Sequence, residues 1–210
     1  MANEIHNYAL ETYRVGDNDY FDMDYFDGLT FTSAKIKGQY LRAGQFTQTV
    51  NGPIVTATTT ESSILGAGQG SLTVPANAFQ VGDTFLCKIK GLCSAHNNDD
   101  WTVRVKSGTT VLAQSLPISM PTITGKSFEL DLIFVIRAIG PSMVGSIVTH
   151  GSFCYNKDSS NAYEGQDFIS VNNSTFDTTI LNSLDVTIEF SSTNANNSVE
   201  TYITNLIKTY

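Results

Sequence analysis

Two pairs of side chains in this sequence have types and spacings that could support catalysis. Glu129 and Asp131 alternate on one face of an expected strand, where two carboxylates could act as the acid and base of a glycoside hydrolase. His150 precedes Cys154 by four residues and could imitate a general base beside a nucleophile. Ion pairing or solvation explains the carboxylates more simply, and an ordinary strand histidine followed by Gly151 explains the second pair. We therefore expect no catalytic residues and no enzymatic activity.

A run of aspartates near the N-terminus raises the question of a calcium site. The run does not match an EF-hand loop, because it lacks the glycine after the third acidic position and the closing glutamate. The three histidines are far apart in sequence, and no phosphate-binding, zinc-binding or serine-nucleophile motif occurs. We therefore expect no metal and no cofactor, and we interpret the run as a solvated acidic face. It consists of Asp17, Asp19, Asp22, Asp24 and Asp27.

The three cysteines form an odd set without the spacing of metal ligands. We expect the cysteines to lie in strands as small apolar residues and to remain free thiols. Cys87 and Cys93 are separated by roughly 20 Å along one expected strand. A disulfide needs Cα atoms within about 7 Å, so these two cysteines are not expected to pair.

Composition narrows the possible functions. The chain has 210 residues, of which 15% are charged, and its net charge is −8. No cluster of Lys and Arg is present, which argues against direct binding of nucleic acid. No apolar run is long enough for a transmembrane helix, and the N-terminus does not resemble a secretory signal, so we expect synthesis in a cytoplasm. Sequons at Asn172, Asn173 and Asn196 are interpreted as turns rich in asparagine.

One segment, residues 127–137, is expected to be the central strand. Its first face is entirely apolar by the two-residue period of a strand and consists of Phe128, Leu130, Leu132, Phe134 and Ile136. The second face changes from Glu129 and Asp131 to Ile133 and Val135. This pattern predicts a sandwich strand whose outer face is solvated at one end and covered at the other.

The remaining segments also favour strands over helices. Residues 37–53 are interpreted as a connector, and residues 156–175 as a polar segment anchored by Tyr163 and Phe168. No segment of useful length has a helical period. We predict an all-β fold, an antiparallel two-sheet sandwich of jelly-roll type. Its further strands are expected at 54–60, 71–74, 84–93, 144–149, 152–155, 184–190 and 199–210, with a hairpin over 101–114.

Residues before the sandwich are expected to form a separate hairpin. Phe21, Met23 and Tyr25 alternate with aspartates, and a type I′ turn is expected at Asp27-Gly28, followed by a return strand from Leu29 to Ile36. A hairpin this small is not stable alone, so it must pack on another surface. We predict an attachment and oligomerisation segment at residues 1–45 and a sandwich domain at 46–210. The expected attachment residues are Phe21, Met23, Tyr25, Phe26, Leu29 and Phe31.

Several stretches resemble structural proteins of viruses. Residues 18–40, with Asn18-Asp19-Tyr20-Phe21-Asp22-Met23 and Ser33-Ala34-Lys35-Ile36, are similar to the N-terminal attachment segment of double-stranded DNA phage structural proteins. Residues 70–83, 171–179 and 184–210 are similar to C-terminal domains of phage tail-fibre and head-fibre proteins and of virion proteins of large DNA viruses. The resemblance implies a jelly-roll or tumour-necrosis-factor-like sandwich, often trimeric, displayed on a virion.

The absence of a long repeated stalk favours a compact capsid-associated protein, spike or penton-type subunit over a tail fibre. We therefore expect a virion structural protein, made in the host cytoplasm, whose partners are copies of itself, other virion proteins and a host receptor at exposed loops. A carbohydrate- or protein-binding β-sandwich module without catalytic activity is the alternative.

Overall fold

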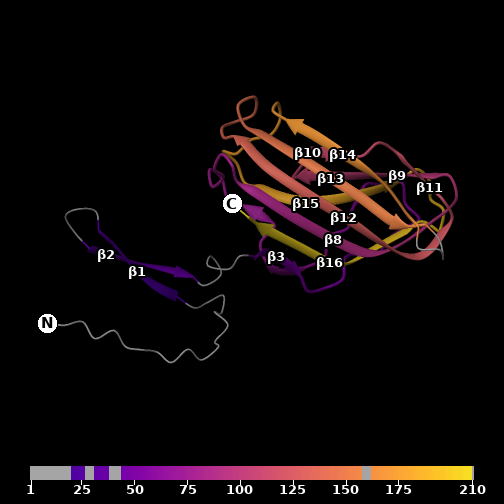
Figure 1. Ribbon diagram of the computed structural model, residues 1–210, viewed down its shortest axis with the longest axis horizontal. Helices are drawn as coiled ribbons and strands as arrows, with labels where there is room; N and C mark the ends of the chain where they lie inside the picture. Colours follow the sequence, from indigo (N-terminus) through magenta and orange to yellow (C-terminus); the bar gives the residue numbers. More distant parts are fainter. Residues whose placement is uncertain (1–19, 27–30, 38–43, 158–161, 210) are drawn as a thin grey trace. The chain divides into compact units, whose positions relative to one another are not determined.

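A computed structural model describes residues 20–26, 31–37, 44–157 and 162–209 (Figure 1). The chain divides into two compact units, Met1–Arg42 and Ala43–Tyr210. The predicted boundary between residues 45 and 46 falls inside β3 (Gly44–Gln48), a strand of the second unit. The described residues form strands and no helix, so none of them forms a helix that could cross a membrane.

The first unit contains one antiparallel hairpin, β1 (Tyr20–Phe26) paired with β2 (Phe31–Lys37). The register places Phe26 opposite Phe31, so four residues, 27–30, connect the strands. The expected two-residue turn at Asp27-Gly28 is therefore wrong in length, because it would have placed Phe26 opposite Leu29. Leu29 itself lies outside the described residues.

The second unit is a sandwich of two antiparallel sheets, as predicted, and its layers are visible in Figure 1. From edge to edge the larger sheet contains β14 (Tyr163–Asn172), β13 (Ser146–Asn156), β12 (Ile123–Ala138), β8 (Thr84–Ala95), β16 (Ser198–Lys208), β3 and β6 (Gly68–Gly70), and β4 (Val55–Thr56) pairs with β16. The smaller sheet contains β10 (Thr110–Gln114), β9 (Asp99–Ser107), β15 (Asn182–Phe190) and β5 (Ser62–Ser63), with β11 (Ile118–Met120) on β9 and β7 (Thr73–Val74) on β15.

The central strand is β12, which pairs with β13 on one side and β8 on the other. The five residues of its predicted apolar face, from Phe128 to Ile136, are all buried between the sheets. On the outer face, Ile133 is 43% exposed. The predicted cover at this end of the outer face is therefore only partial, because Ile133 is exposed whereas Val148, which pairs with Val135, is buried.

Sequence reasoning missed three strands of the larger sheet, the short β6 and two longer ones. The expected connector over 37–53 contains β3, where Phe46 is buried in the core. The expected polar segment over 156–175 contains the edge strand β14, in which Phe168 is buried and Tyr163 is exposed. Only Phe168 and Asn172 of β14 are buried, so the strand lacks the regular apolar alternation by which a half-buried strand is recognised.

Gly151 explains why β13 is continuous instead of two shorter strands. The ring of Phe168 on β14 lies directly across from Gly151, and a Cβ atom at this glycine would lie 2.3 Å from that ring. The glycine therefore provides the space that the aromatic side chain fills. Val144, expected in the strand, lies in the preceding turn.

Candidate functional site

The register of the N-terminal hairpin divides the predicted attachment residues between its two faces. Residues directly opposite each other lie on the same face of a two-stranded sheet. Phe21 pairs with Ile36, Met23 with Ala34 and Tyr25 with Thr32. The other face holds the pairs Asp22–Lys35 and Phe26–Phe31. The hairpin thus has one uncharged face, and Phe26 and Phe31 belong to the opposite one.

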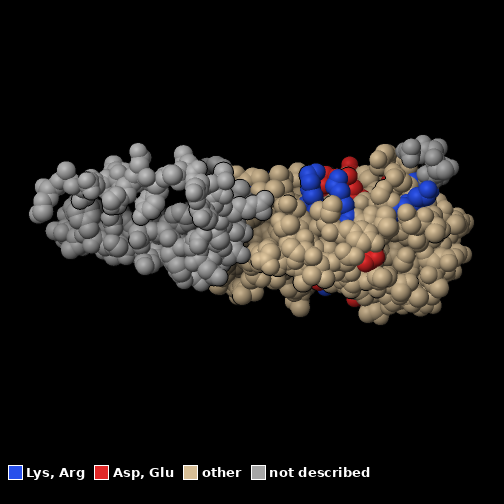
Figure 2. Space-filling view, turned by 90° about the horizontal axis from the view of Figure 1, so that it is seen from below, with Lys and Arg blue, Asp and Glu red and all other residues tan. Residues whose placement is uncertain are grey.

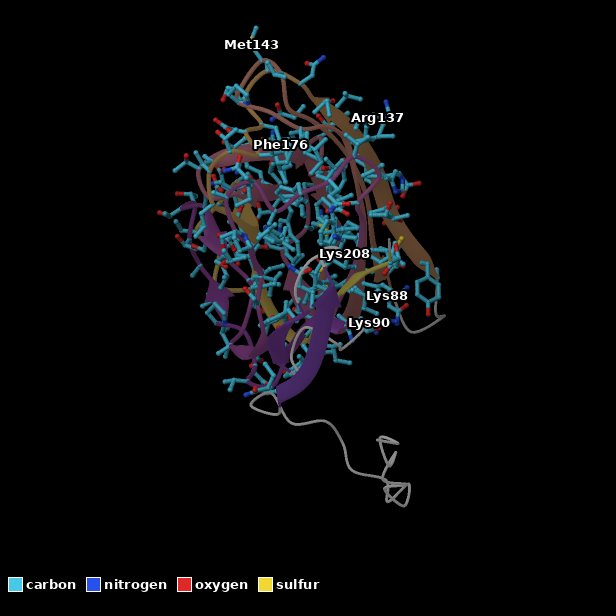
Figure 3. All side chains as sticks on the ribbon, turned by 90° about the vertical axis from the view of Figure 1, so that its left-hand side faces the viewer. Lys88, Lys90, Arg137, Met143, Phe176 and Lys208 are labelled. Carbon is cyan, nitrogen blue, oxygen red and sulfur yellow. The ribbon has the colours of Figure 1, made fainter. Side chains whose placement is uncertain are left out.

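The carboxylates of β12 form ion pairs with lysines on the neighbouring strand β8. The Lys88 Nζ atom lies 3.0 Å from Asp131 Oδ2 and 3.9 Å from Glu129 Oε1, and Lys90 Nζ lies 3.0 Å from Glu129 Oε1. The hydrogen bond to Asp131 raises the pKa of Lys88. The predicted ion pairing is confirmed, and both lysines are labelled in Figure 3. Each carboxylate is held by a lysine instead of being directed into a cleft.

His150 and Cys154 are not brought together. Both lie on β13, four residues apart, which corresponds to about 13 Å along a strand. The Sγ atom of Cys154 is 3.8 Å from Ser152 Oγ. His150 instead lies between Ile133 and Ile169 in the cross-strand register. The pair therefore has no geometry for nucleophilic catalysis.

The cysteines are free thiols, as predicted. Cys87 and Cys93 point into the core from β8, and burial raises the pKa of each thiol to about 12. Such thiols stay protonated near neutral pH and are poor nucleophiles. Cys154 is half-buried.

The remaining predicted polar residues do not form a metal site. His6 and three of the aspartates lie outside the described residues. His96 Nδ1 lies 3.5 Å from Asp99 Oδ2, and hydrogen bonds from Ser192 and Asn197 are the main reasons that the pKa of Asp99 is lowered. Within the described ranges, no group of three His, Cys, Asp or Glu side chains is placed to hold a metal ion.

Sequence reasoning missed an ion-pair network on the outer face of the smaller sheet. Arg104 Nη1 lies 2.5 Å from Glu189 Oε2 and 3.5 Å from Glu61 Oε2, and Lys106 Nζ lies 2.8 Å from Glu61 Oε1. The hydrogen bond from Lys106 is the largest reason that the pKa of Glu61 is lowered. Glu61 immediately precedes β5 and is about 40 residues from β9 in the sequence, so no local pattern relates it to β9. The sparse charged side chains of one face are visible in Figure 2.

Asn172, the first residue of one sequon, and Asn197, the middle residue of the sequon that begins at Asn196, are buried. Asn172 Oδ1 accepts hydrogen bonds from the backbone N–H groups of Thr175 (3.0 Å) and Phe176 (3.1 Å), and its Nδ2 donates to the Val111 carbonyl (3.0 Å). Asn197 accepts a hydrogen bond from the His96 N–H (3.0 Å). Asn196 itself lies in a turn, as expected, whereas Asn172 is the last residue of β14.

The outer face of the larger sheet carries an apolar surface at one end, which we call the face patch. Its members lie on β8, β12 and β14, on both sides of β13, whose residues at these positions are the buried Val148 and the half-buried His150. Ile133 lies beside Leu86 on β8, and Val148 lies between Val135 and Val171. Ile169 is 70% exposed and Val171 is 51% exposed. The face patch consists of Leu86, Ile133, Val135, Ile169 and Val171.

A second apolar surface lies on loops at one end of the sandwich, and we call it the loop tip. Three loops are joined there by backbone hydrogen bonds: Asn77 N–H donates to the Thr178 carbonyl (2.8 Å), and Thr178 N–H donates to the Gly140 carbonyl (2.9 Å). Met143, labelled at this end in Figure 3, is 76% exposed. The loops are thus held in place while their apolar side chains face solvent. The loop tip consists of Val81, Ile139, Met143, Val144, Ile180 and Leu181.

A small cavity of about 50 Å³ lies between the two sheets. Phe79, Phe85, Phe134 and Phe176 line it, together with other mainly apolar side chains. An apolar cavity of this size stays dry and offers little to a polar ligand. The cavity is therefore a packing feature of the core, and the surfaces above are the stronger candidates for binding.

The sequence was compared with known protein families and with curated proteins, and neither comparison found a match. A function must therefore be inferred from the arrangement of the side chains in the structure. It offers two exposed apolar surfaces and an N-terminal hairpin with one uncharged face, which are features of association between macromolecules.

Proposed function

We propose that this chain is a structural subunit of a virus particle, of the spike, fibre, penton or minor capsid type, and that it has no catalytic activity. In this proposal the sandwich is of jelly-roll type, the subunit forms a closed trimer, and the N-terminal unit attaches it to other virion proteins. The subunit is made in the host cytoplasm and resides in the virion. The resemblance of residues 18–40 and of the later segments to phage structural proteins supports the assignment.

The observation that carries the proposal is the division into a large sandwich and a separate two-stranded unit. A two-stranded sheet buries too little surface to be stable in water. The hairpin therefore needs a partner surface, and its register supplies an uncharged face with Phe21, Met23 and Tyr25. Burying one such side chain contributes on the order of 2 kcal/mol, so three together are enough to hold a subunit in place.

The experiment that tests the proposal is incorporation into particles. Mass spectrometry of purified virions should detect the chain, and replacing both Phe21 and Tyr25 by Ala should reduce its incorporation at least tenfold. The matched control replaces Asp22 and Asp24 by Ala, because these residues alternate with the first two on the same strand but lie on the opposite face. Equal incorporation of both variants would contradict attachment through the uncharged face.

Oligomeric state provides a second test. Sedimentation of the isolated protein at micromolar concentration should give a trimer, because closed symmetry is usual for such assemblies. A clean monomer under these conditions would contradict a self-sufficient trimer.

The loop tip favours a second candidate function, a protein-binding module whose partner is a host-surface receptor. Its apolar side chains are exposed on loops that hydrogen bonds already hold in place, so binding costs little ordering entropy. Replacing Met143 by Asp should abolish binding to host cells in this case. The same replacement at Leu116, which is also exposed but lies on a different loop, should leave binding unchanged.

A further inference from the structure

We propose that the loop tip binds the surface of a lipid bilayer with zwitterionic headgroups, and that Met143 and its aliphatic neighbours insert between the lipids. This inference gives the loop tip a different partner from the protein receptor considered above, and it depends on neither the virion assignment nor the N-terminal unit. Four properties of the loops support it: their exposed side chains, the conformation of Met143, their hydrogen bonds and their charges.

The exposed side chains of the loop tip are all aliphatic or methionine. Met143 is 76% exposed, Leu181 is 62% exposed and Val81 is 61% exposed, and Figure 3 places Met143 at one end of the sandwich. Binding sites for proteins are enriched in Trp, Tyr and Arg, and none of these belongs to the loop tip. Binding to a membrane surface needs only apolar area that can enter the boundary between headgroups and acyl chains. The composition of the loop tip therefore favours a bilayer over a protein.

Met143 has a backbone conformation that is unusual for a residue with a Cβ atom. Its φ is 74°, in the left-handed region, where glycine and asparagine are favoured. The turn around it is fixed by hydrogen bonds from the N–H groups of Val144 and Gly145 to the Pro141 carbonyl, both 2.9 Å long. The side chain held in this way is mostly exposed, so the core gains little from it. An unfavourable φ at such a residue indicates a role outside folding.

The backbone polar groups of the loops are bonded within the protein, which lowers the cost of leaving water. The Gly140 N–H donates to Thr178 Oγ1 (2.8 Å), and the Gly140 carbonyl accepts from the Thr178 N–H (2.9 Å). Asn182 Nδ2 donates to the carbonyls of Asp177 (2.8 Å) and Ile180 (2.9 Å). A polar group without a partner is costly at the edge of hydrocarbon. These loops can therefore approach the acyl chains with few such groups.

The charges around the loop tip match a zwitterionic surface. The three loops, residues 75–82, 139–145 and 173–181, contain one charged residue, Asp177. Hydrogen bonds from Thr179 and from the backbone of Ser142 lower its pKa, so it remains ionised at neutral pH. Arg137 is exposed on β12 two residues before Ile139 and is labelled near the same end in Figure 3.

One anion and one cation suit a headgroup that carries both a phosphate and an ammonium group. Arg137 can meet the phosphate, and Asp177 can meet the ammonium. An anionic surface would instead repel the whole chain, whose net charge is −8. Charge complementarity therefore selects a zwitterionic lipid over an anionic one.

The test measures co-sedimentation of the full-length chain with sucrose-loaded vesicles. One set consists of phosphatidylcholine alone, and a second set also contains phosphatidylserine. Neither set contains protein, so a protein receptor cannot contribute to the binding. The variants are Met143→Asp and the conservative Met143→Leu. Leu116→Asp is the matched control, because Leu116 is 72% exposed and lies on a different loop.

We expect the unmodified protein to bind phosphatidylcholine vesicles. Met143→Asp should lower the partition coefficient on the order of tenfold or more, because it removes the burial of one large apolar side chain and adds a charge. Met143→Leu should retain the binding, and Leu116→Asp should leave it unchanged. Phosphatidylserine should not increase it. Circular dichroism should show the same melting for all variants, since both substituted side chains are exposed.

A fluorescent probe tests insertion independently of affinity. An environment-sensitive fluorophore is attached to Met143→Cys in a Cys154→Ser background, because the other two cysteines are buried. Vesicles should shift its emission to the blue and protect it from iodide quenching. The same fluorophore on Leu116→Cys should show neither change.

Three results would overturn the inference. The first is that the unmodified protein does not sediment with phosphatidylcholine vesicles. If cells bind the chain through Met143 in that case, and protease treatment of the cells abolishes the binding, the partner is a protein. The second is equal vesicle binding by Met143→Asp and the unmodified protein, and the third is binding that requires phosphatidylserine; both mean that another surface meets the lipid. A chain that is absent from purified virions but binds these vesicles through Met143 would refute the virion assignment and support this inference.

Discussion

Asn172 offers the sharpest test of how the sandwich is held together at the end of β14. Its Oδ1 atom accepts hydrogen bonds from three consecutive backbone N–H groups, those of Ser174, Thr175 and Phe176. Its Nδ2 atom donates to the Val111 carbonyl on β10 and to Thr175 Oγ1. It therefore fixes the loop after β14 and joins the edges of the two sheets. Replacing Asn172 by Ala removes all of these bonds at a position that is only 9% exposed.

The magnitude follows from the bonds that are lost. Each hydrogen bond contributes about 1 kcal/mol net, and a buried group left without a partner costs more than that. Counting one bond for the shared acceptor Oδ1 and two for the donor Nδ2 gives about 3 kcal/mol for Asn172→Ala, and for a domain of this size the expected fall in Tm is roughly 6–12 °C. Asn172→Asp retains the acceptor oxygen but loses both donated bonds, to the Val111 carbonyl and to Thr175 Oγ1, so its expected cost is smaller, about 2 kcal/mol.

Thermal and urea unfolding followed by circular dichroism measure these differences. Asn173→Ala is the matched control, because Asn173 belongs to the overlapping sequon and its side chain is exposed. We expect its stability to stay within about 0.5 kcal/mol of the unmodified protein. If Asn172→Ala and Asn173→Ala melt within 2 °C of each other, as a rough limit, the assignment of Asn172 as a structural asparagine is refuted.

Three further predictions concern thiols, pH and packing. Ellman's reagent should modify Cys154 first, and the two buried cysteines of β8 should react only after unfolding; rapid reaction of all three thiols would contradict their burial. Because the pKa of Glu61 is lowered in the folded state, its contribution is present above the ordinary value of 4.5 and is lost as the pH falls through the folded pKa. The difference in Tm between Glu61→Gln and the unmodified protein should therefore shrink toward acid pH, and a constant difference between pH 7 and pH 2.5 would exclude this linkage. Gly151→Ala should cost about 2 kcal/mol alone and much less in a Phe168→Ala background, since the added Cβ atom meets that ring; additive costs in the double-mutant cycle would refute the packing argument.

The fold class could be predicted because strand alternation is a local property of the sequence. The alternation from Phe128 to Ile136 specified a buried face, and the hairpin turning at Gly108 was recognised from its turn residues. Gly108 has a φ of 56°, a conformation that favours glycine. Ion pairing of Glu129 and Asp131 was one of two expectations from the sequence, and the lysine partners follow only from the register of β12 with β8.

Other features depend on residues that are far apart in the chain. Glu61 meets Arg104 and Lys106 only because β5 and β9 both pair with β15, and no sequence period encodes that neighbourhood. The strand β14 is specified by the larger sheet it joins, because its own sequence contributes few apolar residues. Its inward Phe168 finds space only through Gly151 on the adjacent strand.

The candidate surfaces also depend partly on the local sequence and partly on the tertiary structure. The sequence alone determined that Ile133 and Val135 share a face with Asp131, because adjacent positions on one strand face are two residues apart. Only the tertiary structure decided that this apolar end is exposed and that Ile169 and Val171 extend it across β13. Exposure depends on which segments cover a face, and that is a property of the assembled sheets and not of any single strand.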